Sequence, residues 1–156
     1  MKYLGCIAGV FAASVAAAET PELVVYTYDS FVSDWGPGPA VEKAFEAECG
    51  CDLKFVGAGD GASLLARVKL EGARTEADIV LGLDTNLTAA AAATELFAPH
   101  GVSAEYNLPI AWEDANFVPF DWGYFAFVHK DGVDAPTDFK ALGESDLKIV
   151  IQDPRS

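Results

Sequence analysis

Apolar and polar residues alternate in blocks that predict strands and helices in turn. Three short apolar runs have the length and composition of strands: residues 23–28, 52–56 and 77–83. Apolar residues at helical spacing follow each run, at residues 39–49, 64–72 and 87–97. The run at 77–83 is almost continuously apolar, which is typical of a strand buried on both faces. The order βαβαβα predicts an α/β fold with a parallel sheet and helices on both faces.

The pattern changes after residue 100. Residues 120–130 contain many aromatic side chains and predict a further strand, residues 138–142 a short helix, and residues 148–152 a last strand. Parallel strands are connected through a covering crossover helix, and no helical pattern follows residue 152. The expectation is a truncated piece that ends at a strand-to-helix turn.

The N-terminal residues have the pattern of a secretory signal peptide. Met1 and Lys2 give a short positive start, residues 3–15 are apolar, and Ala16 to Ala18 fit the small-residue cleavage pattern. The apolar stretch is shorter than the ~20 residues that a membrane-spanning helix needs. We therefore expect residues 1–18 to be a cleaved signal peptide, which predicts export.

Composition and charge limit the class of partner. The chain has 156 residues and is 51% hydrophobic, enough for one domain with a buried core. Its formal net charge of -14 argues against binding to nucleic acid, because a polyanion requires a basic face. The charge favours a cationic ligand or partner, but an acidic, soluble surface is the simpler explanation.

Two cysteines remain outside the signal segment. Cys49 and Cys51 are separated only by Gly50, and an exported protein meets an oxidising environment. We favour a local disulfide between them. Free buried thiols and half of a metal site are the alternatives, although His100 and His129 lie far away in the sequence.

Acidic and hydroxyl residues follow each predicted strand, where ligands bind in open α/β folds. These strand ends contain Tyr28-Asp29-Ser30, Gly59-Asp60-Gly61, Asp84-Thr85-Asn86 and Asp153-Pro154-Arg155-Ser156. Helix capping explains many of these residues, at ~1 kcal/mol each. Capping does not require the glycines around Asp60, which allow a ligand to approach the backbone closely. It does not require the ring of Tyr28 either, which suits stacking on a cation.

Catalytic motifs are sparse. The sequence has no nucleophile-elbow serine, no pair of histidines spaced as metal ligands and no Walker-type phosphate loop. We therefore predict a binding protein and not an enzyme, with no cofactor and no metal.

Five runs carry a resemblance to a known family. They are VYTYDSFVSDWGPGP from Val25, KAFEAECGCDL from Lys43, ADIVLGLDTNL from Ala77, FVPFDWGYFAFV from Phe117 and QDPR from Gln152. Together they resemble the periplasmic thiamine-binding proteins of ABC importers, within the type II periplasmic solute-binding superfamily. That resemblance implies two α/β lobes joined by crossing strands, with the ligand in the cleft between them. Family members are about twice as long as this chain.

The resemblance also assigns parts and partners. It implies an incomplete N-terminal lobe at residues 19–112, then a crossing strand and the beginning of a second lobe at residues 113–156. The implied ligand is thiamine or a thiamine phosphate, and the implied partner is a permease in the inner membrane. Asp60 and Gly61 match the family's ligand contacts, and Tyr28, Asp84 and Ser156 complete the expected site. We expect a periplasmic monomer.

Other functions are also compatible with the residues. A solute-binding protein for iron or a polyamine would share the acidic strand ends. An exported hydrolase would use the carboxylates as acid and base. A truncated chain without function is the remaining alternative.

Overall fold

A computed structural model describes residues 20–151 of the chain. The predicted signal peptide and Ser156 lie outside this range. Three parallel strands form the sheet in the order β2-β1-β3: β1 (Glu22–Thr27), β2 (Asp52–Gly57) and β3 (Ile79–Val80). Thr27 pairs with Gly57, and Tyr26 pairs with Val80, so the three strands end at the same edge of the sheet. The predicted α/β fold with a parallel sheet is confirmed.

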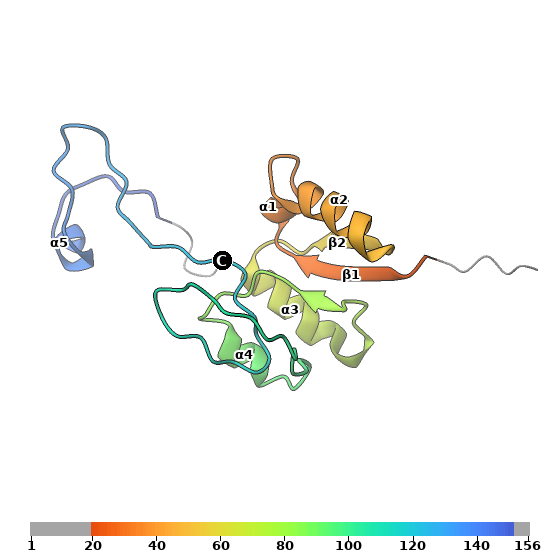
Figure 1. The fold of residues 1–156 in the computed structure, drawn as a ribbon. Helices are drawn as coiled ribbons and strands as arrows, with labels where there is room; N and C mark the ends of the chain where they lie inside the picture. The colour runs from red at the N-terminus through yellow and green to blue at the C-terminus, as the bar shows by residue number, and fades with distance from the viewer. Residues whose placement is uncertain (1–19, 152–156) are drawn as a thin grey trace, which may run out of the picture.

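Helices cover both faces of the sheet (Figure 1). α1 (Asp29–Val32) and α2 (Gly38–Cys49) lie on one face, and α3 (Gly61–Glu71) lies on the other. Successive side chains of β1 point to opposite faces, so Val24 and Tyr26 pack against Leu64 and Val68 of α3. On the other face Phe31 of α1 is buried, with its ring 5.3 Å from that of Phe55.

The boundaries of α2 and α3 follow the local sequence. Pro39 lies in the first turn of α2, where its missing amide costs no hydrogen bond. Gly50 ends α2 in the left-handed conformation, with φ 64°. Asp60 caps α3, and Gly72 ends it and begins a short 3-10 helix, η1 (Gly72–Arg74). The predicted helices over these residues are confirmed.

Two predicted elements are shorter than expected. β3 includes only two residues of the apolar run 77–83, and Gly82 turns the chain away with φ 107°. β3 is an edge strand and Ile79 is 46% exposed, so the prediction of burial on both faces is wrong. The helix expected at residues 87–97 is α4 (Thr88–Ala92). It ends early because the Thr94 hydroxyl bonds the Ala91 carbonyl and Glu95 turns left-handed, with φ 57°.

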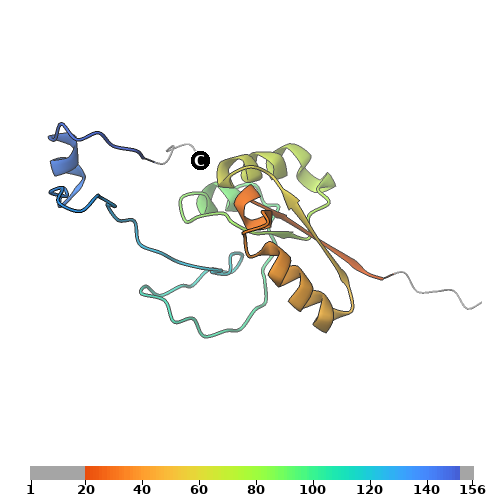
Figure 2. The ribbon, with the colours of Figure 1, turned by 90° about the horizontal axis from the view of Figure 1, so that it is seen from above.

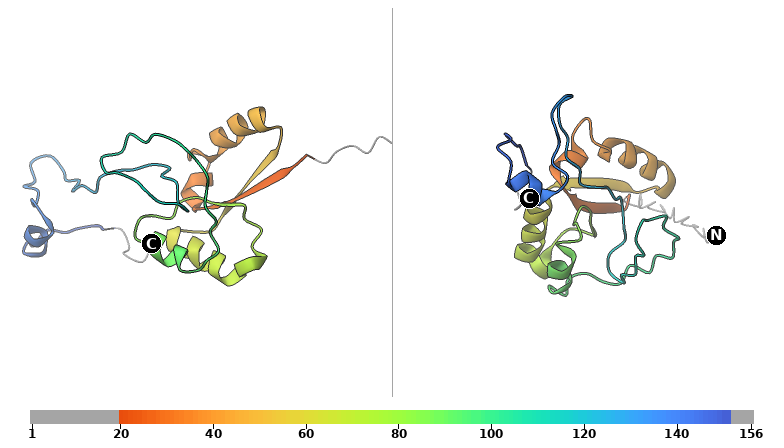
Figure 3. Two further views of the ribbon diagram at one scale, coloured as in Figure 1. Left: turned by 60° about the horizontal axis from the view of Figure 1, so that its bottom comes forward. Right: turned by 90° about the vertical axis from the view of Figure 1, so that its left-hand side faces the viewer.

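Residues 101–151 differ from the prediction more strongly. The strands predicted at residues 120–130 and 148–152 are wrong for the described residues, which contain no strand there. Gln152 lies outside the described range. The short helix is confirmed as α5 (Phe139–Gly143), capped by Asp138. Figures 2 and 3 show the segment with α5 projecting from the packed sheet and helices.

The two cysteines form the disulfide favoured by the sequence. Cys49, the last residue of α2, is bonded to Cys51, which directly precedes β2. The Leu53 amide also donates to the Glu46 carboxylate at 3.0 Å. The turn between α2 and β2 is therefore held by a covalent bond and by a side-chain hydrogen bond. Within residues 20–151, no helix has the length and apolar character needed to cross a membrane.

Candidate functional site

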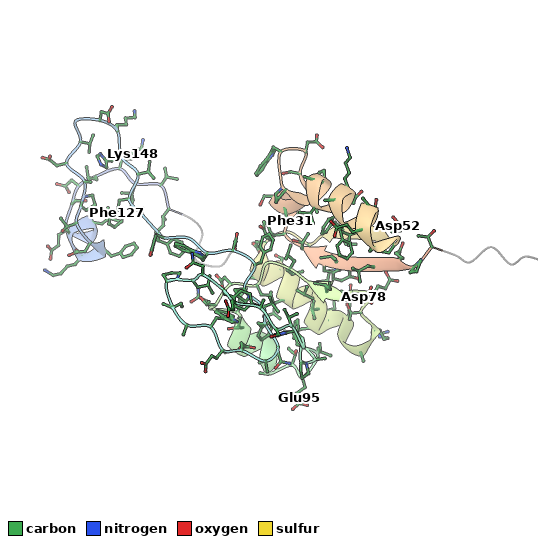
Figure 4. The ribbon with its side chains drawn as sticks, in the orientation of Figure 1. Phe31, Asp52, Asp78, Glu95, Phe127 and Lys148 are labelled. Atoms are coloured by element: carbon green, nitrogen blue, oxygen red, sulfur yellow. A yellow bond between two sulfur atoms is a disulfide. The ribbon has the colours of Figure 1, made fainter. Side chains whose placement is uncertain are left out.

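A cavity of about 380 Å³ opens where the three parallel strands end. Its lining comes from the segments after β1, β2 and β3: Tyr28, Ser30, Gly59, Asp60, Gly61, Gly82, Asp84 and Leu87. Phe31 marks this carboxyl end of β1 in Figure 4, whereas Asp52, the first residue of β2, lies at the opposite end of the sheet. The structure thus brings together Tyr28, Asp60 and Asp84.

Asp60 caps the helix that points toward this cavity. Its Oδ1 accepts a hydrogen bond of 2.7 Å from the Ser63 amide at the start of α3. This backbone hydrogen bond, with a smaller contribution from the Ser63 side chain, lowers the pKa of Asp60 below its usual 3.8. Because its pKa is lowered, the half-buried Asp60 carboxylate is ionised at neutral pH and can attract a cation.

Asp84 has a clear role in the local turn. Its Oδ1 accepts hydrogen bonds from the amides of Asn86 at 2.9 Å and Leu87 at 3.1 Å. The N-cap residue of α4 is Leu87, so Asp84 orders the turn before this helix and does not cap it directly. Its negative charge nevertheless lies on the wall of the same cavity as Asp60.

The Tyr28 ring is packed against Gly82. A Cβ built on Gly82 would lie 2.2 Å from Tyr28 Cδ1, so only glycine leaves room for the ring. The rings of Tyr28 and Phe31 meet edge to face, with centroids 5.7 Å apart. Burial raises the pKa of Tyr28 above its usual 10.0, and the nearby Asp121 carboxylate raises it further. The phenol is therefore neutral at physiological pH and can donate a hydrogen bond.

The glycines after β2 and β3 let two loops approach closely. A Cβ on Gly61 would lie 3.2 Å from both the Gly82 carbonyl oxygen and Leu87 Cδ1. The space that a side chain would fill at Gly61 is thus already limited by the neighbouring loop. Gly61 contributes backbone to the cavity lining.

Sequence reasoning missed part of this site. Gly82 lies near the end of the strand predicted at residues 77–83, and a glycine within a strand pattern often marks a close approach of another group to the backbone. Asp121 lies in a run that the sequence predicts as a strand, and nothing local indicates that it approaches Tyr28. Trp35 and Trp122 are 80% and 52% exposed and do not line the cavity.

A second cavity, of about 420 Å³, is lined by Tyr26, Arg67, Leu70, Glu71, Arg74 and Glu76. Its central polar groups satisfy one another. Arg67 lies over the Tyr26 ring at 4.1 Å from the centroid and donates to the Tyr26 hydroxyl at 3.2 Å and to Glu71 at 2.8 Å. Among the described residues predicted as ligand contacts, none lies there, and this arrangement stabilises the end of α3.

The first cavity, where the three parallel strands end, has the chemistry of a cation site. The carboxylates of Asp60 and Asp84 and the neutral phenol ring of Tyr28 line a space large enough for a small organic molecule. The described part of the chain contains no group of three or more His, Cys, Asp or Glu side chains placed to hold a metal ion.

Known proteins are similar to this chain in both sequence and fold. No family model matches the chain. The chain is 52% identical to the thiamine-binding periplasmic protein of Escherichia coli K12, over 97% of its own length and 46% of the relative's. The protein of the same description from Salmonella typhimurium is 55% identical, over 87% of this chain and 43% of the relative. The Haemophilus influenzae protein is 41% identical, over 94% of this chain and 46% of the relative.

A solved structure of a protein described as a periplasmic thiamin binding protein is also similar to this chain. It is 54% identical with a TM-score of 0.77, and the match covers 85% of this chain and 42% of that chain. The resemblance noted in the sequence is confirmed, and the α/β fold is shared. The chain spans less than half the length of these relatives.

Proposed function

We propose that this chain contributes one wall of a binding site for thiamine or a thiamine phosphate. The observation that carries the proposal is the single cavity formed by Tyr28, Asp60, Gly61 and Asp84. Relatives at about half identity are named for thiamine binding, and the cavity has the chemistry that this vitamin requires. Ser156, outside the described residues, is proposed as a further contact.

The ligand's chemistry matches the cavity group by group. Thiamine carries a permanent positive charge on its thiazolium ring, which a carboxylate attracts and an aromatic face stabilises by ~0.5–2 kcal/mol. Asp60 and Asp84 supply the negative charge, and Tyr28 supplies the aromatic face. A phosphate ester would meet the amide groups at the start of α3, since helix N-termini favour anions.

The remaining assignments extend the proposal to the whole protein. We propose a non-enzymatic, monomeric receptor that is exported through residues 1–18 to the periplasm and delivers its ligand to a membrane permease. Residues 19–112 form the N-terminal lobe in this proposal. Residues 113–156 cross to a second lobe, and closure of the two lobes around the ligand signals the permease.

Calorimetric titration of the chain with thiamine at low ionic strength tests the proposal. We expect saturable binding that Asp60→Asn weakens by about tenfold, because the amide can still cap α3 but lacks the negative charge. Asp138→Asn is the matched control. Asp138 caps α5 with the same 2.7 Å bond, to the Ala141 amide, but does not line the cavity.

Two results would contradict the proposal. One is the absence of thiamine binding by the unchanged chain, and the other is equal affinity of wild type and Asp60→Asn. Parallel titrations with spermidine and ferric ion distinguish a receptor for another cation. Phosphate release from thiamine phosphates would instead indicate a hydrolase.

A further inference from the structure

Two reciprocal hydrogen bonds tie the loop that carries Asp60 to the start of α1. The Asp29 amide donates to the Gly59 carbonyl oxygen at 2.8 Å, and the Gly59 amide donates to Asp29 Oδ1 at 2.9 Å. They continue the parallel pairing of β1 with β2 beyond the last paired residues, Thr27 and Gly57. The side chain of Asp29 thus replaces a strand partner for Gly59.

Gly57 leaves the space that this carboxylate needs. A Cβ on Gly57 would lie 2.7 Å from Asp29 Oδ1 and 3.5 Å from Val32 Cγ2. Gly57 is not among the residues with positive φ, so its backbone conformation does not require glycine. The absence of a side chain at Gly57 therefore allows the Asp29 carboxylate to approach the loop.

The position of Gly59 determines where Asp60 points. Gly59 has φ 85°, a conformation that glycine adopts without steric cost. Asp60 follows with extended backbone, and its side chain bonds the Ser63 amide at 2.7 Å. A shift of the Gly59 peptide would move the Asp60 carboxylate relative to Tyr28, which lines the same cavity.

We propose that Asp29 is a positioning residue of the ligand site: its carboxylate holds the loop from Gly57 to Gly61 so that Asp60 faces the cavity. The role in ligand binding rests on the proposed function, whereas the role in loop geometry does not. Asp29 is not itself part of the cavity lining, so it acts through Asp60.

A purely local role for Asp29 makes a different prediction. Asp29 is the first residue of α1, where a negative charge also interacts favourably with the helix dipole. Asp29→Asn separates the two roles, because the amide oxygen still accepts from Gly59 but the charge is gone. The positioning role predicts that Asp29→Asn behaves as wild type, while Asp29→Ala does not.

Amide hydrogen exchange of the unliganded chain, measured by NMR, tests the loop. We expect the Gly59 amide to exchange about tenfold faster in Asp29→Ala and in Gly57→Ala, which removes the space for the carboxylate, and to be unchanged in Asp29→Asn. The Leu81 amide, which donates to Tyr26 in the sheet, reports whether the fold is intact. Unchanged exchange at Gly59 in Asp29→Ala would overturn the proposal.

Titration with thiamine tests the coupling to Asp60. Asp29→Ala should weaken binding by about tenfold when Asp60 is present and have little further effect in the Asp60→Ala background. Additive losses in the double variant would overturn the positioning role. If the unchanged chain does not bind thiamine, the proposed function fails, and the exchange of the Gly59 amide then decides on Asp29 by itself.

Discussion

Residues 20–100 and residues 101–151 use apolar side chains in opposite ways. All buried hydrophobic side chains of the described chain lie between Val24 and Ala91. In the later segment Phe125 is 93% exposed and Val128 is 97% exposed. Both regions contain apolar runs, but only the first brings parallel strands and crossover helices together. Apolar composition alone does not bury a side chain, because burial requires a second element to pack against.

The two regions nevertheless meet at the candidate site. The Phe120 ring lies 5.7 Å from the Phe31 ring, with an edge-to-face arrangement. Asp121, the next residue, contributes to the raised pKa of Tyr28. Earlier in the same segment, the Asn116 side chain donates to the Phe97 carbonyl at 2.6 Å, and the Phe97 and Phe117 ring centroids are 5.2 Å apart. Together with the hydrogen bonds of His100 to the carbonyls of Asp114 and Ala115, these contacts place the meeting of the two regions at residues 114–121.

The largest expected effect separates a buried side chain from an exposed one. Leu64 is fully buried between α3 and the sheet, so Leu64→Ala should lower the free energy of unfolding by about 3 kcal/mol. Phe125→Ala should change it by less than about 0.5 kcal/mol, because the side chain is exposed. Urea unfolding followed by circular dichroism measures both. Similar losses would show that the two regions are equally packed.

A glycine pair separates steric clash from backbone strain. Gly82→Ala should destabilise the protein by about 2 kcal/mol or more, since it adds a clash with Tyr28 to a left-handed backbone. Gly132 also has a positive φ, 79°, but no atom lies within 4 Å of its Cβ position. Gly132→Ala should therefore cost only the backbone term, about 1 kcal/mol. Thermal unfolding compares them, and an equal cost would argue against the Tyr28 contact.

The disulfide should contribute less than the core. Cys49 and Cys51 enclose one residue, and the entropy of closing so short a loop is worth about 1.5 kcal/mol. The double variant Cys49→Ser/Cys51→Ser should lose no more than this in urea unfolding. A loss as large as that of Leu64→Ala would mean that the covalent turn, and not packing, organises the first region.

The smallest effect tests the contact between the two regions. Asp121→Asn should lower the pKa of Tyr28, without returning it to 10.0, because burial is the larger cause of the shift. Phenolate absorbance measures this, with Tyr28→Phe to identify the signal among the tyrosines. An unchanged titration would place Asp121 away from Tyr28.

The sign of the linkage follows from the direction of that shift. The folded-state pKa of Tyr28 is raised, so its contribution to stability is complete below the unfolded pKa of about 10 and is lost as the pH rises through the folded value. Asp121→Asn should therefore reduce the loss of stability above pH 10.

Much of the first region could be predicted from the sequence. The spacing of apolar residues and the length of each apolar run predicted β1, β2, α2 and α3. The two helices also have strong local signals, such as Pro39 and Gly72. The gathering of Tyr28, Asp60 and Asp84 followed from a general rule for parallel strands. The strands at residues 120–130 and 148–152 were wrong because aromatic and branched residues favour a strand only when another strand pairs with them.

The sequence by itself determined the parallel α/β order, the cap at Asp60, the local disulfide and the acidic character of the strand ends. Each depends on residues close together in the chain or on a rule of strand connection. Only the tertiary structure decided that Gly82 makes room for Tyr28, that Asp29 holds Gly59, and that Asp121 approaches the site. These contacts join residues that are distant in the chain, and their geometry depends on packing that no local pattern encodes.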